Sequence, residues 1–580
     1  MDAAQFFSDP IHSIHKRYEA LRAFCFEQKT ASMVAKQYGY TLSTLYSLVR
    51  DFKETIKTTS GVDQFFIQPQ MGRKMRDDHD ELCDLIIGLR KKYLSVGDIK
   101  SILDSQNKSV SERTIYNIIH AEGFARLPRR NRESQFEGLA QVSIPATKAC
   151  LLTDVVEEEF YTQNAGLLCF LPYLKTYGID KIIEASNYPG TQTLPTKNSI
   201  LSFLALKLSN IRRYTADDLW CMDRGIGLFA DLNVLPKTAW FTSYSHRVTR
   251  EMNLSFLKSL NALWMKHGLL SDTANMDFVA IPYWGDDAHL ENNWSGTRHK
   301  ALSSILAAIA NDPDTGIITY GDANVRHQNE AKVAVEFLDF YKSSGATDLK
   351  YLVFDSKFTT YQNLAKLNEN GVKFLTIRRR GKSIVSKLDE LPTTSWKKIR
   401  VPTGEGKTRS LKVCEQFFKL DGYGKEVRQV AITGHGKIKP ALIITNDFDL
   451  KLELIVRKYA RRWLVEKAIS EQTHFFHLNR VSSSMVIKVD FDLTMTILAH
   501  NLYRLFALEL TGYEHNTAQT LYDNFIHNAG RVKLDSEKIV VRLKKKRNLP
   551  ALLTRMKPFQ NQEIPWLASR KFVLEADTHS

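Results

Sequence analysis

The chain contains few cysteines, and their spacing does not suit a metal site or a disulfide framework. None of the six forms a C-x-x-C pair; they are Cys25, Cys83, Cys150, Cys169, Cys221 and Cys414. Structural zinc sites and disulfide-rich secreted domains both require closely spaced cysteines. The pattern therefore argues against both classes and favours a reducing cytoplasm.

A long hydrophobic run is also missing. The most apolar stretches, such as Ser303–Ala310, are much shorter than the run of about 18 residues that a membrane-spanning helix needs. The first residues include Asp2 and Asp9 and lack the basic start and apolar run of a signal peptide. We therefore expect neither a membrane-bound nor an exported protein.

Acidic residues are fewer than basic ones. The 580 residues include 80 Lys and Arg against 64 Asp and Glu, which gives a net charge of +16. Such an excess favours a polyanionic partner, and without a membrane segment we expect this partner to be nucleic acid. At about 150 residues per domain, the chain has room for roughly three or four domains.

The first predicted domain, residues 1–60, has the spacing of a helix-turn-helix. Helices are predicted over Thr30–Tyr38 and Ser43–Phe52. Two closely crossing helices need a small residue, a turn glycine and two apolar anchors, which are here Ala35, Gly39, Leu45 and Leu48. The second helix would enter a major groove with its exposed residues Ser43, Thr44, Ser47 and Arg50. The alternative is an ordinary helical hairpin in a bundle.

A second helix-turn-helix and a basic linker are predicted over residues 80–135, with a less regular pattern. A helix over Ser95–Asp104 is followed by capping residues in Ser109–Glu112 and by a helix over Arg113–His120. A basic run then surrounds Pro128 and contains Arg126, Arg129, Arg130 and Arg132. This run is either a solvated linker or an arm that contacts DNA phosphates.

Strands and helices alternate from about residue 274, after a region (136–270) that is predicted to be a helical domain. The predicted order is three strands joined by tight turns, then helix, strand, helix and strand: Met276–Pro282, Ile305–Ala310, Gly316–Tyr320, Glu330–Tyr341, Tyr351–Asp355, Thr360–Asn370 and Val372–Ile377. This order matches the first part of an RNase H-like fold.

A β-rich insertion is predicted to interrupt this core. Short β-prone runs fill residues 380–447, and helical periodicity resumes at Leu450. The core would then comprise residues 271–379 and 448–512, followed by a C-terminal region, 513–580. We therefore predict an α/β fold class: an RNase H-like catalytic core with an inserted β-rich subdomain, preceded by an all-α helix-turn-helix DNA-binding region.

Three acidic residues stand where a two-metal phosphodiester site would need them. Asp277 lies within the first predicted strand, Asp355 ends the fourth, and Glu466 lies on the helix after the insertion. Such chemistry requires carboxylates from separate elements to converge on divalent cations. Each acid taken alone favours a surface or capping role, and it is their order on strand, strand and helix that favours a metal site. Other acids compete, namely Asp286, Asp287, Asp322, Glu453 and Glu471.

A tyrosine and an arginine precede Glu466 at helical spacing. Tyr459, Arg462 and Glu466 stand at i, i+3 and i+7, which predicts one shared helix face. An arginine there can hold a phosphate through two parallel bonds, and a tyrosine can hydrogen-bond to the same backbone. An exposed Arg–Glu helix pair is the alternative, although it leaves the tyrosine unexplained.

These residues resemble the signature Y-x2-R-x3-E-x6-K of the cut-and-paste insertion-sequence transposases with a DDE catalytic core. The chain has Tyr459, Arg462 and Glu466, with Thr473 where the family has lysine. The segments Met276-Asp277-Phe278 and Phe354-Asp355-Ser356-Lys357 also look like this group. The resemblance covers roughly residues 270–510.

The resemblance implies a divalent-metal enzyme that acts on the ends of a mobile element. Asp277, Asp355 and Glu466 would be its catalytic metal ligands, for two magnesium ions or for manganese, and Tyr459 and Arg462 would contact DNA near the cleaved strand. The partner would be double-stranded DNA, both transposon ends and target. A homodimer or higher assembly on DNA and a cytoplasmic, nucleoid-associated location in a bacterial-type cell are expected.

Further DNA contacts are expected outside the acidic site. In relatives with an insertion, an aromatic residue there can hold a flipped base; Trp396 is the one tryptophan of this insertion, and a buried anchor is its other reading. Two basic runs could follow DNA phosphates, and they include Arg378, Arg379, Lys544 and Lys545.

Two other functions fit part of the sequence. A non-catalytic DNA-binding regulator, or a transposase relative without activity, would account for the helix-turn-helix and the positive charge. A hydrolytic nuclease with the same acidic triad would account for the catalytic residues. Only a DNA-cleaving enzyme accounts for the three acids together with Tyr459 and Arg462.

Overall fold

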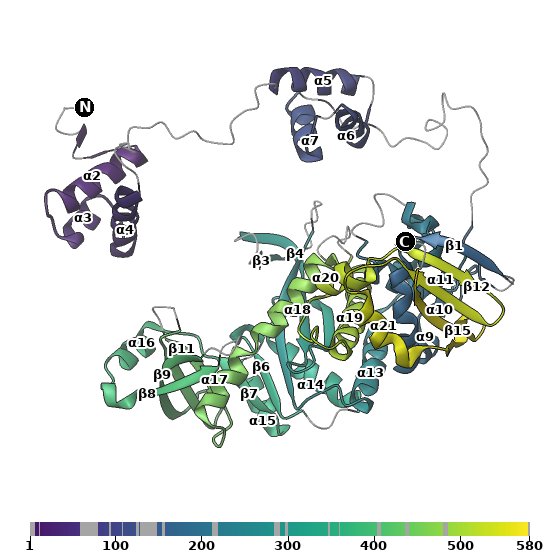
Figure 1. The fold of residues 1–580 in the computed structure, drawn as a ribbon. Helices are drawn as coiled ribbons and strands as arrows, with labels where there is room; N and C mark the ends of the chain where they lie inside the picture. The colour runs from purple at the N-terminus through teal and green to yellow at the C-terminus, as the bar shows by residue number, and fades with distance from the viewer. Residues whose placement is uncertain are drawn as a thin grey trace. The chain divides into compact units, whose positions relative to one another are not determined.

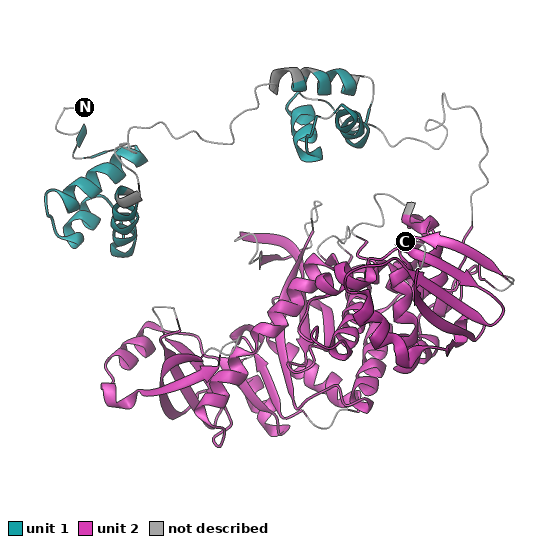
Figure 2. Cartoon of the chain, in the orientation of Figure 1, with its two compact units in different colours: residues 1–144 teal, residues 145–580 magenta. Residues whose placement is uncertain are grey.

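The structure is a computed structural model, and its chain divides into two compact units, residues 1–144 and 145–580 (Figure 2). It describes the chain outside residues 1–5, 8, 11, 59–78, 92–93, 107, 123, 125–126, 128–147, 153–156, 212–218, 284–289, 296–299, 346–348, 359, 403–407, 436–439, 479–484 and 578–580. The predicted contact residues Arg126, Arg129 and Arg130, with Arg132, lie outside the described residues.

The first unit begins with three helices around a small apolar core: α2 Ser13–Cys25, α3 Ala31–Gln37 and α4 Leu42–Thr58 (Figure 1). Ala35 and Leu45 are buried in this core, and Leu48 is partly buried against it. Gly39 has a φ of 64°, which a residue without Cβ adopts at no steric cost, and it makes the turn after α3. The predicted inward positions of the first helix-turn-helix are therefore confirmed.

Three further helices of this unit have a core of their own: α5 His79–Lys91, α6 Val96–Ser105 and α7 Glu112–Ala121. Ser95 begins α6 with a capping box in which it and Asp98 bond to each other's backbone N–H groups. Ser111 caps α7, and Ile115 and Ile119 are buried as predicted.

The second unit is built around a sheet of ten described strands. Its first part has the order β5-β4-β2-β6-β7; β4 is antiparallel to β2 and β5, whereas β2, β6 and β7 run parallel. The bounds are β2 Thr273–Pro282, β3 Asn292–Ser295, β4 Lys300–Asn311, β5 Ile318–Val325, β6 Tyr351–Phe354 and β7 Lys373–Ile377. Helices α14 (Val333–Ser343) and α15 (Tyr361–Glu369) provide the crossovers before β6 and β7. The predicted strands and helices occur in the predicted order, and the chain is a mixed α/β protein. Strand β3 was not predicted; it lies between β2 and β4 in the sequence, so these two strands are not joined by the predicted tight turn.

The β-rich insertion extends this sheet instead of forming a separate one. Its strand β11 (Ala441–Thr445) pairs antiparallel with β7, with Ile443 opposite Ile377. Strands β10 (Glu426–Thr433), β9 (Thr408–Lys419) and β8 (Lys397–Pro402) follow in that order. Helix α16 (Lys382–Asp389), which the sequence did not predict, covers a small core with Trp396 at its edge.

A second sheet joins two regions that are far apart in the sequence. Strand β1 (Glu158–Thr162) pairs with β12, and the order is β1-β12-β13-β15-β14. The other bounds are β12 Gly530–Leu534, β13 Lys538–Leu543, β14 Gln562–Ile564 and β15 Arg570–Ala576. The region over 136–270 therefore contains a strand as well as the predicted helices, and the C-terminal region pairs with it.

Helices complete the second unit and pack its main hydrophobic core. They are α8 Phe170–Thr176, α9 Ile179–Glu184, α10 Thr196–Leu208, α11 Arg224–Phe229, α12 Thr238–Tyr244, α13 Arg250–Lys266, α17 Leu452–Ala460, α18 Trp463–His474, α19 Val486–Glu509, α20 Ala518–Leu521 and α21 Leu549–Met556. Gly321 on β5 leaves room for Ile497 of α19, where a Cβ atom would clash. In the described chain no helix has the length and apolar composition needed to cross a membrane.

Candidate active site

The first two predicted acids lie side by side on neighbouring strands. Parallel strands β2 and β6 pair Met276 with Phe354, so Asp277 and Asp355 are the next residues on the two strands. Asp355 follows the last residue of β6, and its Oδ1 accepts a hydrogen bond from the Ser356 backbone N–H at 2.6 Å. The strand register therefore brings together two carboxylates that are 78 residues apart in the sequence (355 − 277).

Asp277 is the most perturbed of these acids. Its side chain is 18% exposed. Burial raises the pKa of Asp277 to about 6; the positive charge of Arg462 acts against this, and the negative charges of Glu466 and Asp355 act with it. The other two predicted ligands are therefore close enough to act electrostatically on Asp277. Perturbed carboxylates of this kind are enriched at functional sites.

Arg462 connects the third acid to the first. Its Nη1 contacts Asp277 Oδ2, and its Nη2 donates to Glu466 Oε1 at 2.5 Å. Arg462 is 17% exposed, whereas Glu466 is 54% exposed. One guanidinium thus contacts two carboxylates from different elements and offsets part of their negative charge, and only the Glu466 end of the arrangement is open to solvent.

The predicted single helix over Tyr459, Arg462 and Glu466 is wrong. Helix α17 ends at Ala460 and α18 begins at Trp463, with Arg461 and Arg462 between them. The backbone N–H of Arg462 bonds to the Tyr459 carbonyl three residues earlier, so the junction is a tight turn. The residues still meet, because the Arg462 guanidinium lies 5.9 Å from the centre of the Tyr459 ring. Burial raises the pKa of Tyr459 to about 12, so its hydroxyl stays protonated at neutral pH.

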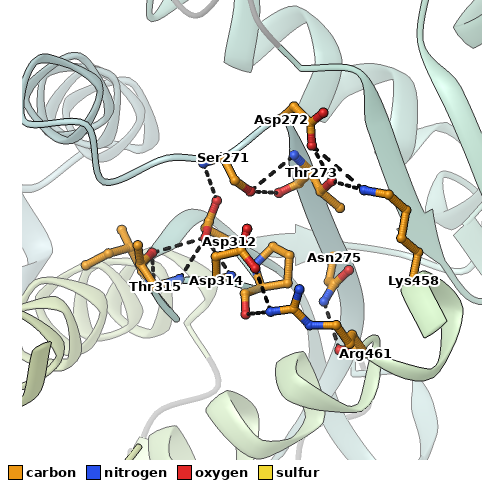
Figure 3. A network of polar contacts seen from close by, with 11 residues as sticks. Ser271, Asp272, Thr273, Asn275, Asp312, Asp314, Thr315, Lys458 and Arg461 are labelled. Atoms are coloured by element: carbon orange, nitrogen blue, oxygen red, sulfur yellow. Dashed lines mark hydrogen bonds and ion pairs between the residues drawn. The ribbon is translucent and has the colours of Figure 1, made fainter. Parts of the chain in front are cut away.

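A polar network fixes the junction to β2 and to the turn between β4 and β5 (Figure 3). Asn275, fully buried and two residues before Asp277 on β2, donates from Nδ2 to the Arg461 carbonyl at 3.0 Å. The Arg461 side chain donates to the Pro313 carbonyl at 2.7 Å and pairs with Asp314 at 2.6 Å. Residues two apart on a strand share a face, so β2 holds Arg461 through Asn275 and contacts Arg462 through Asp277.

Two further groups tighten this network. Lys458 Nζ donates to Thr273 Oγ1 at 2.8 Å, which anchors the end of α17 to the start of β2. Asp312 Oδ1 accepts from the backbone N–H groups of Asp314 and Thr315 at 2.8 and 2.9 Å, which shapes the turn that Arg461 contacts. Neither Asn275 nor Lys458 was predicted from the sequence to be part of the site. The two-residue period of a strand puts Asn275 on the same face as Asp277, and this signal could have indicated Asn275 but not Lys458.

The chemistry of the three carboxylates suits a hard divalent cation, but the arrangement is not a preformed metal cluster. Among the described residues, no three His, Cys, Asp or Glu side chains are gathered closely enough to hold a metal ion. Arg462 occupies oxygen atoms of Asp277 and Glu466 that a cation would need. The carboxylate oxygens of Asp277, Asp355 and Glu466 are therefore suitable ligands for such a cation. They could bind it once Arg462 releases Asp277 and Glu466.

The competing acids have other surroundings. Asp322 is 2% exposed, Arg250 contacts both of its carboxylate oxygens, and the Tyr320 hydroxyl donates to Oδ2 at 3.2 Å. Glu471 is partly buried and accepts from the Ala518 backbone N–H at 3.2 Å. Glu453 is exposed on α17. Asp286 and Asp287 lie outside the described residues.

The remaining predicted contact residues differ in their exposure to solvent and in their side-chain contacts. Ser43, Thr44 and Arg50 are exposed on α4 and Ser47 is partly buried; Arg379, Lys544 and Lys545 are also exposed. Arg378 lies 4.4 Å from the Phe418 ring centre and donates to Gln429 Oε1 at 3.0 Å. Trp396 is partly buried against Leu388 and its neighbours, and the Thr473 hydroxyl donates to backbone carbonyls of its own helix, Ile469 among them, at 3.1 Å.

Comparison with known proteins shows a similarity that includes part of this site. Residues 286–502 match the family model described as "Transposase DDE domain", a range that contains Asp355 and Glu466 and begins after Asp277. No curated protein matches the chain. A similar solved structure is the cryo-EM structure of the piggyBac transposase synaptic complex with hairpin DNA, at 13% identity and a TM-score of 0.35, covering 64% of this chain and 82% of that chain. A structural similarity this low does not by itself establish a shared fold. The family match agrees with the resemblance inferred from the sequence: residues 286–502 are similar to a transposase DDE domain.

Proposed function

We propose that the protein is a DNA transposase that binds the ends of its mobile element and catalyses metal-dependent strand cleavage and strand transfer. The observation that carries this proposal is the pairing of β2 with β6, which brings Asp277 beside Asp355, together with Arg462, which contacts both Asp277 and Glu466. The strand order β5-β4-β2-β6-β7, with three antiparallel strands followed by parallel ones, supports an RNase H-like core.

The three carboxylates would hold two divalent cations, magnesium or manganese, which when bound supply an activated oxygen nucleophile and stabilise the leaving oxygen. The residues of the chain supply the rest. Arg462 offers a planar fork that suits either two carboxylates or two phosphate oxygens. We expect it to exchange Asp277 and Glu466 for the phosphate beside the scissile bond when DNA binds. Tyr459, protonated and next to Arg462, would donate to the same strand.

Duplex DNA, from the element's ends and the target, is the proposed substrate. The net charge of +16 favours a polyanion, and α4 exposes Ser43, Thr44 and Arg50 at the positions of a recognition helix. A homodimer or higher assembly would hold two ends together. The basic residues Arg379, Lys544 and Lys545 are exposed and would follow phosphates outside the active site.

A regulator without catalysis and a nuclease that only hydrolyses are the alternatives. The strand register that brings Asp277 beside Asp355, and the link through Arg462 to Glu466 on a separate helix, favour an enzyme over a regulator. Transposition and hydrolysis differ in their products, because only the first joins the element's 3′ ends to target DNA. Inverted repeats in the DNA that brackets the gene would also favour transposition.

The test is strand cleavage of duplex DNA that contains the sequences flanking the gene. Replacing Asp277, Asp355 or Glu466 with Ala should abolish cleavage in magnesium and leave DNA binding nearly unchanged, and a chelator should have the same effect on the unaltered protein. Glu453→Ala, on the exposed side of α17, is the matched control and should cleave normally. Full cleavage by any of the three variants would overturn the assignment of that residue.

A further inference from the structure

Helices α4 and α7 begin with the same capping arrangement. Thr41 Oγ1 accepts from the Thr44 backbone N–H at 3.1 Å and lies 2.8 Å from Thr44 Oγ1. Ser111 Oγ accepts from the Thr114 backbone N–H at 3.1 Å and lies 2.8 Å from Thr114 Oγ1. Ser111 stands 70 residues after Thr41 (111 − 41), and Thr114 stands 70 residues after Thr44 (114 − 44). Each position of α4 therefore corresponds to the position of α7 with a number 70 higher.

The buried positions of the two helices follow the same register. Leu45 and its counterpart Ile115 are both fully buried, and Val49 and Ile119 are 6% and 4% exposed. Each helix is the third of a three-helix group with a separate apolar core. The face that α7 turns to solvent is therefore the counterpart of the α4 face that is proposed to read DNA.

The exposed face of α7 carries an ordered row of polar and aromatic side chains. Arg113, Tyr116, Asn117 and His120 are all exposed, and at 100° per residue they fall within an arc of about 100°. The Arg113 guanidinium lies 5.9 Å from the Tyr116 ring centre, and the Tyr116 and His120 rings stack at 5.8 Å. These contacts hold the row in place over two helical turns.

The side chains of this row are those that read base edges and phosphates. Arginine donates two hydrogen bonds to guanine, and asparagine donates one hydrogen bond to adenine and accepts one from it. The acidic residues Glu112 and Glu122 lie outside the arc, at the first helical position and at the cap. Tyr116 is the one large apolar side chain that the described part of α5 to α7 exposes, so the face lacks the apolar patch that a protein partner would need.

We propose that α7 is a second DNA-reading helix, which inserts Arg113, Tyr116, Asn117 and His120 into a major groove. The transposon end would then contain two separate recognition segments, one for α4 and one for α7. This inference rests on the proposed function only in taking duplex DNA as the partner, and it does not depend on cleavage.

The experiment is a binding selection with the full-length chain and a pool of duplexes whose randomised region spans about four helical turns. The unaltered protein should enrich two sequence motifs. Asn117→Ala should lose base preference in one motif and weaken binding to the selected duplex by about 5- to 150-fold, the value of one bidentate base contact. Arg50→Ala, the matched variant on α4, should affect the other motif. Ser105→Ala, exposed at the end of α6, should change neither.

The outcomes separate this inference from the proposed function. Enrichment of a single motif that Arg50→Ala removes and Asn117→Ala leaves intact would overturn the role of α7. Unchanged affinity in a double Arg113→Ala, Asn117→Ala variant would do the same, since exposed side chains contribute little to folding. If no motif is enriched at all, the DNA-binding part of the proposed function fails too. Two motifs in a protein that never cleaves would overturn the catalytic proposal and leave α7 as a reader.

Discussion

The guanidinium of Arg462 contacts the carboxylate of Asp277, 185 residues earlier in the chain. The same group holds Glu466, so one cation contacts two of the three acids that are proposed to bind metal and reduces the repulsion between them. An unpaired cluster of carboxylates in a partly buried site would be destabilised by mutual repulsion. Arg462 therefore stabilises the free protein, and its placement beside the acids leaves it next to any phosphate that binds there.

Asn275 is expected to position the catalytic residues without touching DNA. Asn275→Ala removes its bond to the Arg461 carbonyl, which should destabilise the protein by about 1–3 kcal/mol and lower the cleavage rate at saturating DNA, with DNA affinity unchanged. Asn261→Ala is the matched control, because Asn261 is also buried and donates to a carbonyl, that of Thr319, at 2.9 Å but on α13. Equal slowing by both variants would mean that Asn275 is only a structural residue.

His500 should make the protein less stable as the pH falls. Burial, helped by the charge of Arg504, lowers the pKa of His500 to about 3, although Glu471 lies 3.7 Å from its ring. The unfolded chain has the ordinary value of about 6.5. Between these values the unfolded state binds a proton that the folded state does not, so stability is lost as pH falls below about 6.5.

The measurement is the unfolding midpoint between pH 6.5 and 5, compared with His500→Gln, in which the amide can still donate to the Gly316 carbonyl that His500 Nε2 contacts at 3.1 Å. The unaltered protein should lose stability more steeply than the variant, by at most about 1.4 kcal/mol per pH unit. His246→Gln, exposed after α12, should not change the slope. A steeper slope in His500→Gln would show that the sign is wrong.

Replacing Arg50 tests whether the first predicted helix-turn-helix reads DNA through α4. Arg50→Ala should weaken binding to end DNA by about 1–3 kcal/mol if the side chain reads a base, or reduce the salt dependence by about one charge if it contacts only a phosphate. Asp51 pairs with Arg50 at 3.0 Å, so Asp51→Ala should keep or improve binding. Equal affinity of the Arg50 variant and the unaltered protein, measured across salt concentrations, would exclude α4 as the reader.

The sequence predicted the elements of the sheet that carry the acids. Strands β2, β4 and β6 are buried on both faces and therefore read as short, nearly continuous apolar runs. Asp277 and Asp355 stand out because they interrupt or end such runs. The second sheet was not predicted, because β1 is a five-residue strand with two glutamates and its partner β12 is more than 360 residues away. Local patterns do not report pairing over such a distance.

The break between α17 and α18 also could not be predicted from the local sequence. Residues 452–474 contain no Gly or Pro that would predict it. The contacts at the break are tertiary: Asn275 bonds to the Arg461 carbonyl, and Arg461 bonds to the turn between β4 and β5. Helical spacing still brought Tyr459, Arg462 and Glu466 together correctly as a group, because the two junction residues keep helical backbone angles.

Arg461 and Arg462 are adjacent but are expected to have different roles. Replacing each with lysine should distinguish these roles. Arg462→Lys keeps the charge but loses the planar fork that contacts two partners at once, so it should bind end DNA and cleave it slowly. Arg461→Lys can still reach Asp314, an exposed partner, and should cleave at nearly the normal rate. The rates must be compared at saturating DNA, so that a binding defect is not mistaken for a defect in chemistry. If the two variants cleave equally fast, or if Arg461→Lys is the slower, then Arg462 does not hold the scissile phosphate, and the proposed exchange of carboxylates for phosphate is wrong.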